Sequence, residues 1–148
     1  VLQLDICNFT ALSQKVDALE VASMIHKLFS EFDKAVIKLS LFKIDTIGDA
    51  YIVAGWLPCE SDWFAQPMTR KACQSMLSLS HMMLDAVSAH SLQGGPTLQC
   101  RIGISVGIVA SGVLGRRQSR FHVVGQTMQE VDNLEQTAGV NTVHVSDK

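Results

Sequence analysis

The stretch that decides the fold is Phe42–Tyr51, which reads FKIDTIGDAY. Aliphatic and β-branched side chains on both sides of Gly48-Asp49 give the flanking segments the composition of strands. A Gly-Asp pair between two such runs is a turn signal, so the stretch predicts an antiparallel hairpin. Asp49 at this turn then has two readings: a carboxylate solvated by water, or a carboxylate placed to bind a cation.

A second acidic residue, Asp5, stands in a similar place near the start of the chain. Val1–Asp5 reads as a buried strand, and Ile6–Thr10 follows as a turn into a helix. Two carboxylates at strand ends could share divalent cations. Hard oxygen ligands suit Mg²⁺, which usually takes one or two carboxylates together with substrate phosphates. The second aspartate therefore favours the cation-binding reading of Asp49.

Two long helices are predicted from apolar residues that recur at three- and four-residue spacing. The first follows Asp17, which opens a capping-box pattern with Glu20. The second is expected over Arg70–His90, with Cys73 and Leu77 near its inner face. The remaining elements are a helix at Gln126–Gln136 and strands at Leu98–Val106, Ile108–Leu114, Phe121–Val124 and Thr142–Val145. Helices and strands that alternate irregularly around one hairpin favour an α+β sandwich.

Composition limits the classes of function. A chain of 148 residues with 47% hydrophobic residues can form one domain with a real core. A net charge of -2 gives no electrostatic reason to expect nucleic acid or a membrane surface as partner. The basic residues are scattered, apart from one cluster at Arg116, Arg117 and Arg120. No apolar run approaches the roughly 20 residues of a membrane span.

The four cysteines, Cys7, Cys59, Cys73 and Cys100, form no CxxC pair, and no histidine clusters with them. This pattern disfavours disulfides and a zinc site and fits a reducing, cytosolic setting. Cys73 and Cys100 lie in apolar patterns and are expected to be buried thiols. Because the chain begins inside a strand pattern and stops just after another, we expect it to be truncated at both ends. A membrane anchor elsewhere in the parent protein stays open.

Four segments, in order, together resemble the catalytic domain of class III nucleotide cyclases, the adenylate and guanylate cyclases. They read DICNFTALS, KIDTIGDAYIVAGWLP, RIGISVGIVASGVLG and FHVVGQTMQEVDNLEQTAG, and the match runs along essentially all of residues 1–148. The resemblance implies a ferredoxin-like βαββαβ core, a mixed and mainly antiparallel sheet covered by helices. It also implies conversion of GTP or ATP into a 3′,5′-cyclic nucleotide and pyrophosphate.

The resemblance assigns roles to five residues near the first strand, to Asp49 of the hairpin turn and to one arginine. Asp5 and Asp49 match the family's two metal-binding aspartates, and the backbone carbonyl of Ile6 would add a ligand for two Mg²⁺ or Mn²⁺ ions. The triphosphate-binding positions are Asn8, Phe9, Thr10 and Arg101. Family members usually carry Gly at the position of Asn8, and Asn tolerates a left-handed backbone better than most residues.

The base-reading positions are less typical of the family. Asp45 stands where members commonly have Lys for adenine or Glu for guanine, so its polarity leans towards GTP. His122 stands where Asp, Cys, Ser or Thr is usual, and it decides nothing. Asp45 and His122 as ordinary polar strand residues are an equal alternative.

The last helix departs most from the family pattern. Gln129 occupies the position of a transition-state Asn, and Asn133 that of a transition-state Arg. Asn133 cannot supply positive charge to a phosphate that gains negative charge, and losing one such donor costs about a hundredfold or more in rate. The chain therefore resembles the metal-bearing half of an asymmetric pair, whose partner domain carries the purine reader, the Asn and the Arg.

Two other hypotheses stay open. The chain could be a catalytically inactive pseudo-cyclase that binds a nucleotide or regulates its partner. It could also form an active homodimer in which Gln129 partly replaces the Asn and Arg116 or Arg117 replaces the Arg, although these two arginines fit a solvated loop better.

Overall fold

The computed structural model describes residues 1–57, 59–92 and 94–148. Within them, a short 3-10 turn, η1, accompanies the helices and strands. In chain order the elements are β1 (Leu2–Ile6), α1 (Phe9–Ser13), α2 (Ala18–Lys38), β2 (Phe42–Ile47), β3 (Ala50–Ala54), η1 (Trp63–Ala65), α3 (Pro67–Ser88), β4 (Cys100–Ile104), β5 (Ala110–Leu114), β6 (Arg120–Val124), α4 (Gln126–Thr137) and β7 (Val143–Val145).

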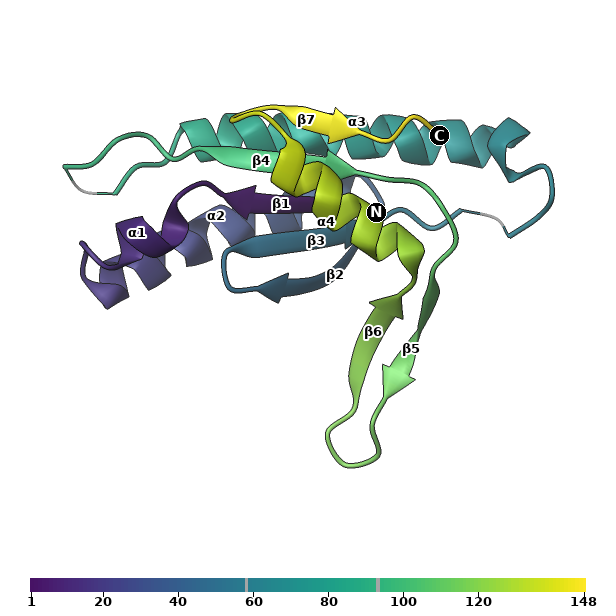
Figure 1. Ribbon diagram of the computed structural model, residues 1–148, viewed down its shortest axis with the longest axis horizontal. Helices are drawn as coiled ribbons and strands as arrows, with labels where there is room; N and C mark the ends of the chain where they lie inside the picture. Colours follow the sequence, from purple (N-terminus) through teal and green to yellow (C-terminus); the bar gives the residue numbers. More distant parts are fainter. Residues whose placement is uncertain (58, 93) are drawn as a thin grey trace.

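The main sheet has five strands in the order β2-β3-β1-β4-β7 (Figure 1). β2, β3, β1 and β4 pair antiparallel, and β7 joins β4 in parallel. The order β1-α2-β2-β3-α3-β4 along the chain is the predicted ferredoxin-like βαββαβ core, and the mixed, mainly antiparallel sheet is also as predicted. The hairpin FKIDTIGDAY forms as the central sequence signal indicates, with Gly48 at φ 61 in its turn.

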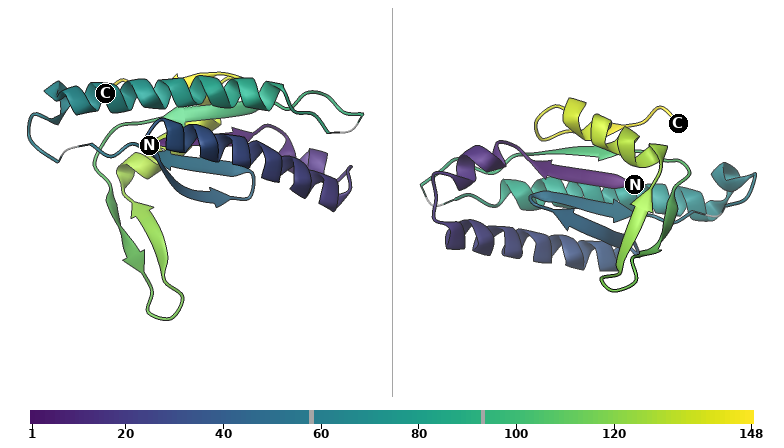
Figure 2. Two further views of the ribbon diagram at one scale, coloured as in Figure 1. Left: turned by 180° about the vertical axis from the view of Figure 1, so that it is seen from behind. Right: turned by 60° about the horizontal axis from the view of Figure 1, so that its bottom comes forward.

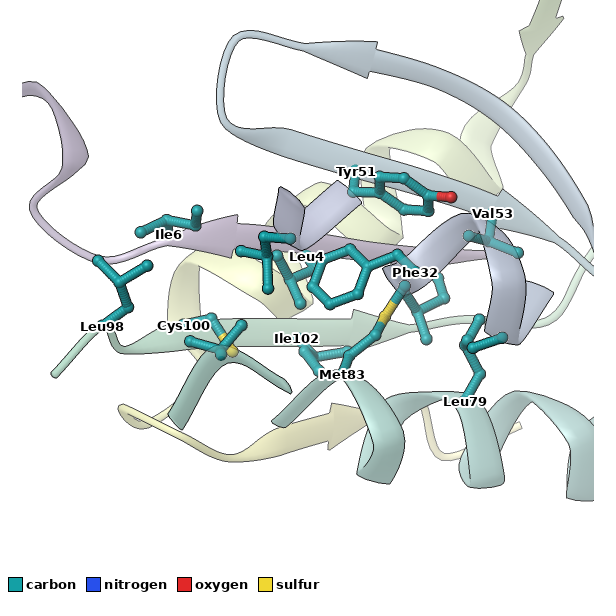
Figure 3. Packing of buried hydrophobic residues seen from close by; sticks show 14 of the residues in the cluster. Leu4, Ile6, Phe32, Tyr51, Val53, Leu79, Met83, Leu98, Cys100 and Ile102 are labelled. Atoms are coloured by element: carbon teal, nitrogen blue, oxygen red, sulfur yellow. The ribbon is translucent and has the colours of Figure 1, made fainter. Parts of the chain in front are cut away.

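The two faces of the sheet are covered differently. α2 and α3 lie on one face, and α4 crosses the other (Figures 1 and 2). Leu2, Leu4 and Ile6 of β1 are buried on the side of α2 and α3, which places Gln3 and Asp5 on the side of α4, because successive strand residues point to opposite faces. The core between sheet and long helices includes Phe32, Tyr51, Leu79, Met83 and Ile102 (Figure 3).

The helix ends follow local chemistry. The side chain of Asp17 caps α2 and accepts a hydrogen bond from the backbone N–H of Leu19 at 2.9 Å, as the capping pattern predicts. α3 begins at Pro67, earlier than predicted, because proline fits the first helical position. Cys100 is buried as expected, but Cys73 is exposed and Leu77 is 45% exposed, so their inner-face assignment is wrong. Neither α2 nor α3, nor any other helix among the described residues, has the length and apolarity needed to cross a bilayer.

A second, two-stranded sheet of β5 and β6 projects from the body of the molecule (Figure 1). Near the turn of this hairpin, the ring of Phe121, which lies opposite Val113, contacts Phe42 and Trp56, with centroid distances of 5.4 and 6.5 Å. Several apolar side chains of the hairpin and its flanks face solvent instead: Ile108, Val113, Leu114 and Val124.

Candidate functional site

Strand register brings the two aspartates together. Leu4 of β1 lies opposite Tyr51 of β3, and Ala50 begins β3 directly after Asp49. The turn of the β2–β3 hairpin therefore lies beside the end of β1 that carries Asp5. The side chain of Asp49 is close enough to that of Asp5 to raise its pKa, and a shared metal site at these two residues stays a prediction.

The surroundings of Asp5 disfavour its charged form. Partial burial raises the pKa of Asp5 to about 7, and the negative charges of Asp49 and Glu135 add to the rise, while Arg101 opposes it. Burial and a like charge both penalise a bare carboxylate. Asp5 and Asp49 are thus a pair of acids that a bound cation would stabilise.

The donor set fits a hard divalent cation. Two carboxylates, with the backbone of Ile6 at the end of β1, match the protein share of a Mg²⁺ site that substrate phosphates complete. The side chain of Ile6 is 1% exposed in the core, so only its backbone is available. No group of three or more His, Cys, Asp or Glu side chains among the described residues forms an all-protein metal cage. The two aspartates therefore suit an ion that arrives with, or is completed by, a nucleotide.

Arg101 lies directly opposite Asp5 in the β1–β4 pair. Its Nη2 is 3.5 Å from Oδ2 of Asp5, and its Nε donates a hydrogen bond to Oε1 of Glu135 at 2.9 Å. Arg101 thus lies beside the carboxylate of Asp5, and the side chain of Glu135 on α4 holds it there.

Glu135 is a site residue that sequence reasoning missed. It lies on the buried face of α4 with Thr127 and Val131, and its side chain is 4% exposed. Burial raises the pKa of Glu135, and Arg101 acts in the opposite direction. The sequence signal that could have found it is a carboxylate at i+4 from Val131 on the apolar stripe of an amphipathic helix, because such a group needs a buried partner.

The predicted phosphate loop has the expected backbone. Asn8 adopts φ 54 and ψ 25, the left-handed conformation that Gly commonly takes. It precedes the five-residue helix α1, whose first amides have no partner within the helix. The side chain of Phe9 packs against the core, whereas Asn8 and Thr10 are exposed. Phe9 could therefore contribute only its backbone to an anion.

The two base-reading positions lie on different elements with different neighbours. Asp45 of β2 accepts a hydrogen bond from the backbone N–H of Thr46 at 2.8 Å and lies 3.6 Å from Nη2 of Arg120. His122 of β6 is exposed and lies opposite Gly112. Arg120, rather than His122, is the β6 side chain that reaches Asp45.

The two residues of α4 that differ from the family pattern lie on its outer face. Gln129 and Asn133 are exposed, while Thr127, Val131 and Glu135 are buried towards the sheet. Gln129 and Asn133 therefore lie on the opposite side of the helix from Glu135, the residue that contacts Arg101. Arg116 and Arg117 are exposed in the loop between β5 and β6, as expected of a solvated loop.

Known proteins match the chain along its length. The model of the adenylate and guanylate cyclase catalytic domain matches residues 1–148. The bovine guanylate cyclase soluble subunit alpha-1 is 34% identical over 142 residues, which cover 96% of this chain and 19% of that protein. The receptor-type guanylate cyclase Gyc76C of Drosophila melanogaster is 30% identical over 146 residues, covering 97% of this chain and 9% of that protein. The chain thus spans less than a fifth of either relative.

A solved structure shows the same fold. The guanylate cyclase domain of RhGC from Catenaria anguillulae, in complex with GTP, superposes with a TM-score of 0.83 at 26% identity, covering 99% of this chain and 76% of that one. The family model thus covers the whole chain, and the fold is that of a solved guanylate cyclase domain. The chain belongs to the family of adenylate and guanylate cyclase catalytic domains.

Proposed function

We propose that this chain is the metal-bearing half of an asymmetric purine nucleotide cyclase, which forms a 3′,5′-cyclic nucleotide and pyrophosphate together with a complementary cyclase domain. The observation that carries this proposal is an unequal set of residues. Asp5, Asp49 and Arg101 converge at one edge of the sheet, whereas Gln129 and Asn133 replace the transition-state pair on α4.

Each of the proposed site residues has a defined role in the reaction. Asp5 and Asp49 hold two Mg²⁺ or Mn²⁺ ions, and Ile6 adds its carbonyl oxygen. When bound, such ions lower the pKa of the attacking ribose hydroxyl and neutralise the leaving phosphates. The backbone at Asn8–Thr10 and the guanidinium of Arg101 orient the triphosphate, because amides at a helix start and a planar cation both favour phosphate oxygens.

A partner is needed because this chain lacks one charge. Negative charge builds on the phosphate in the transition state, and a neutral amide at Asn133 cannot offset it. The outer face of α4, with Gln129 and Asn133, and the exposed apolar side chains of the β5–β6 hairpin give a second domain a surface to cover. The name of the bovine relative, a subunit, fits an enzyme built from paired chains.

The partner, rather than this chain, selects the base. Asp45 already has Arg120 as a neighbour, and in an asymmetric pair Asp45 and His122 line the second, degenerate pocket. GTP is the first substrate to test because both curated relatives above are named guanylate cyclases. ATP is the alternative substrate. We further propose that the domain works on the cytosolic side of a larger protein, as the receptor-type name of the Drosophila relative suggests.

The test is a Mg²⁺- and Mn²⁺-dependent cyclase assay with GTP and with ATP, on the chain alone and mixed with a purine-reading cyclase half. We expect no activity alone and activity on mixing, lost when Asp5→Ala or Asp49→Ala is introduced. Cyclase activity of the unmixed chain would contradict the inference that Asn133 cannot replace the transition-state Arg. A complex of the two halves that forms but shows no cyclase activity would contradict the half-enzyme.

A second candidate function is a pseudo-cyclase that binds a nucleotide or regulates its partner. The degenerate α4 and the contact of Arg101 with Asp5 favour it. Asp5→Ala with Asp49→Ala separates the two candidates. A half-enzyme loses activity with these changes, whereas a pseudo-cyclase leaves the activity of its neighbour intact.

A further inference from the structure

Arg101 lies between two carboxylates that hold it unequally. Its Nε donates to Glu135 at 2.9 Å, within the normal range of a charge-assisted hydrogen bond, whereas its Nη2 is 3.5 Å from Asp5. The side chain of Glu135 is 4% exposed and that of Asp5 is 28% exposed. The shorter and less solvent-exposed contact of Arg101 is therefore with Glu135 of α4 and not with Asp5 of β1.

A glycine fixes the position of Glu135. A Cβ on Gly103 of β4 would lie 2.5 Å from the backbone nitrogen of Glu135 and 2.5 Å from the carbonyl oxygen of Val131. The backbone of α4 thus rests directly on β4, two residues from Arg101 on the same face of the strand. Further contacts attach α4 to the sheet, since Gln3 donates to Asp132 and Ser105 to Glu130. Glu135 is therefore held in place by the packing of the helix.

We propose that Glu135 is a positioning residue that anchors Arg101 away from Asp5 and so keeps the metal-site carboxylates open to a divalent cation. This inference rests on the metal role proposed above for Asp5 and Asp49. It assigns Glu135 a function that concerns cation access and not the contact between Arg101 and a nucleotide.

The physical reason is competition for one carboxylate. Without the negative charge of Glu135, the partly buried guanidinium of Arg101 keeps Asp5 as its nearest anion in the β1–β4 pair. A guanidinium binds a carboxylate well through two parallel N–H donors, and the 3.5 Å contact can shorten into such a pair. Arg101 would then occupy the oxygens that the divalent ion needs, and the affinity for the ion would fall.

The test measures Mn²⁺ binding by electron paramagnetic resonance, with Mn²⁺ alone as the probe. Glu135→Gln keeps the shape and a hydrogen-bond acceptor but removes the charge. We expect it to weaken Mn²⁺ binding by about 10- to 100-fold, the usual loss when a group that orients a metal site is changed. Arg101→Gln should bind Mn²⁺ at least as tightly as the wild type, and the double variant should behave like Arg101→Gln.

The reversal by Arg101→Gln separates positioning from general damage, because a fold defect is not repaired by a second substitution. Asp132→Asn is the matched control: it removes a negative charge from the same helix but keeps an oxygen that accepts the hydrogen bond of Gln3, so α4 stays attached and Mn²⁺ affinity should stay near the wild-type value. Where Glu135→Gln does not fold, Glu135→Asp keeps the charge and withdraws it by one methylene. An intermediate loss of affinity is then expected.

Three results would overturn the inference. One is an unchanged Mn²⁺ affinity in the folded Glu135 variants. Another is a loss of equal size in the Arg101→Gln background, which would mean that Glu135 acts through its own charge. The last is a wild-type chain that binds no Mn²⁺. Cyclase activity of the mixed halves tests the proposed function separately, so either proposal can fail alone.

Discussion

Asp5 lies in an environment that disfavours its charged form. It shares a partly dry strand end with Asp49, and Glu135 adds a third negative charge that Arg101 only partly offsets. In the absence of a divalent cation these charges destabilise the fold, since a carboxylate that repels its neighbours favours the protonated state. The stability of the protein should therefore report directly on this site.

The pH dependence follows from the raised pKa. Because the pKa of Asp5 is about 7 in the folded protein and 3.8 is the ordinary value, the folded state binds the extra proton between these values. The contribution to stability is present below pH 4 and is lost as pH rises towards 7. Asp5→Asn removes this loss. At pH 8 without divalent cations we expect a higher melting temperature by about 2–4 °C, the change that roughly 1 kcal/mol gives in a chain of this size.

Calorimetry at pH 4 and pH 8 checks this expectation, with exposed Asp85→Asn as the control that should show no gain. At pH 4 the Asp5→Asn variant and the wild type should melt together. Mn²⁺ should then stabilise the wild type and not Asp5→Asn. A variant that melts lower than the wild type at pH 8 in metal-free buffer would contradict the repulsion.

Among the elements, α4 contributes to the proposed site through both of its faces. Its buried face supplies Glu135 to Arg101, and its outer face presents Gln129 and Asn133. This double role depends on the close approach at Gly103. The other element with an unusual position is the β5–β6 hairpin, which leaves the main sheet and exposes apolar side chains.

Gly103→Ala should separate α4 from the sheet. The added methyl group would meet the α4 backbone at 2.5 Å, so the helix must shift, and overpacking of this kind costs about 1–3 kcal/mol. Gly112→Ala is the control, because a Cβ at Gly112 meets nothing within 4 Å. Urea unfolding of the two variants should show a loss for Gly103→Ala alone. Equal stability of both would disprove the tight contact.

The hairpin should act in association and not in folding. Val113 and Leu114 are 66% and 57% exposed, so changing both to Ser removes little buried surface from the isolated chain. We expect an unchanged melting temperature and weaker binding to the complementary cyclase half, measured by analytical ultracentrifugation. Val140→Ser, at a 52% exposed position after α4, should change neither quantity. A large fall in melting temperature for the hairpin variant would contradict this assignment.

At the scale of the whole molecule, the proposed asymmetry between the metal-binding residues and the α4 residues has a direct consequence. Gln129→Asn with Asn133→Arg restores the pair that the family pattern requires on the outer face of α4. The double variant should cyclise a purine nucleotide as a homodimer, since one copy then offers the aspartates and the other the cation. Activity should rise with protein concentration and vanish with Asp49→Ala added. An inactive double variant that still dimerises and binds GTP or ATP would argue against the half-enzyme.

Much of the fold could be predicted from the sequence because the signals are local. Apolar spacing of three and four residues marks α2 and α3, and Gly48-Asp49 between strand-like runs marks the β2–β3 hairpin. The two aspartates at strand ends and the left-handed backbone of Asn8 could also be predicted, since each residue lies in or beside a turn that the adjacent sequence indicates. The prediction for Cys73 and Leu77 was wrong because α3 carries more apolar residues than its buried face can hold, so some of them are exposed.

The sequence by itself thus determined most of the secondary structure and the α+β class, because periodicity and turn chemistry are properties of neighbouring residues. The order of its motifs indicated the family, and the resemblance to that family implied the βαββαβ order. Only the tertiary structure decided that Arg101 divides its contacts between Asp5 and Glu135, and that Asp45 faces Arg120. These pairs join positions far apart in the chain. They depend on strand register and on how closely α4 can approach β4 at Gly103, which no local pattern specifies.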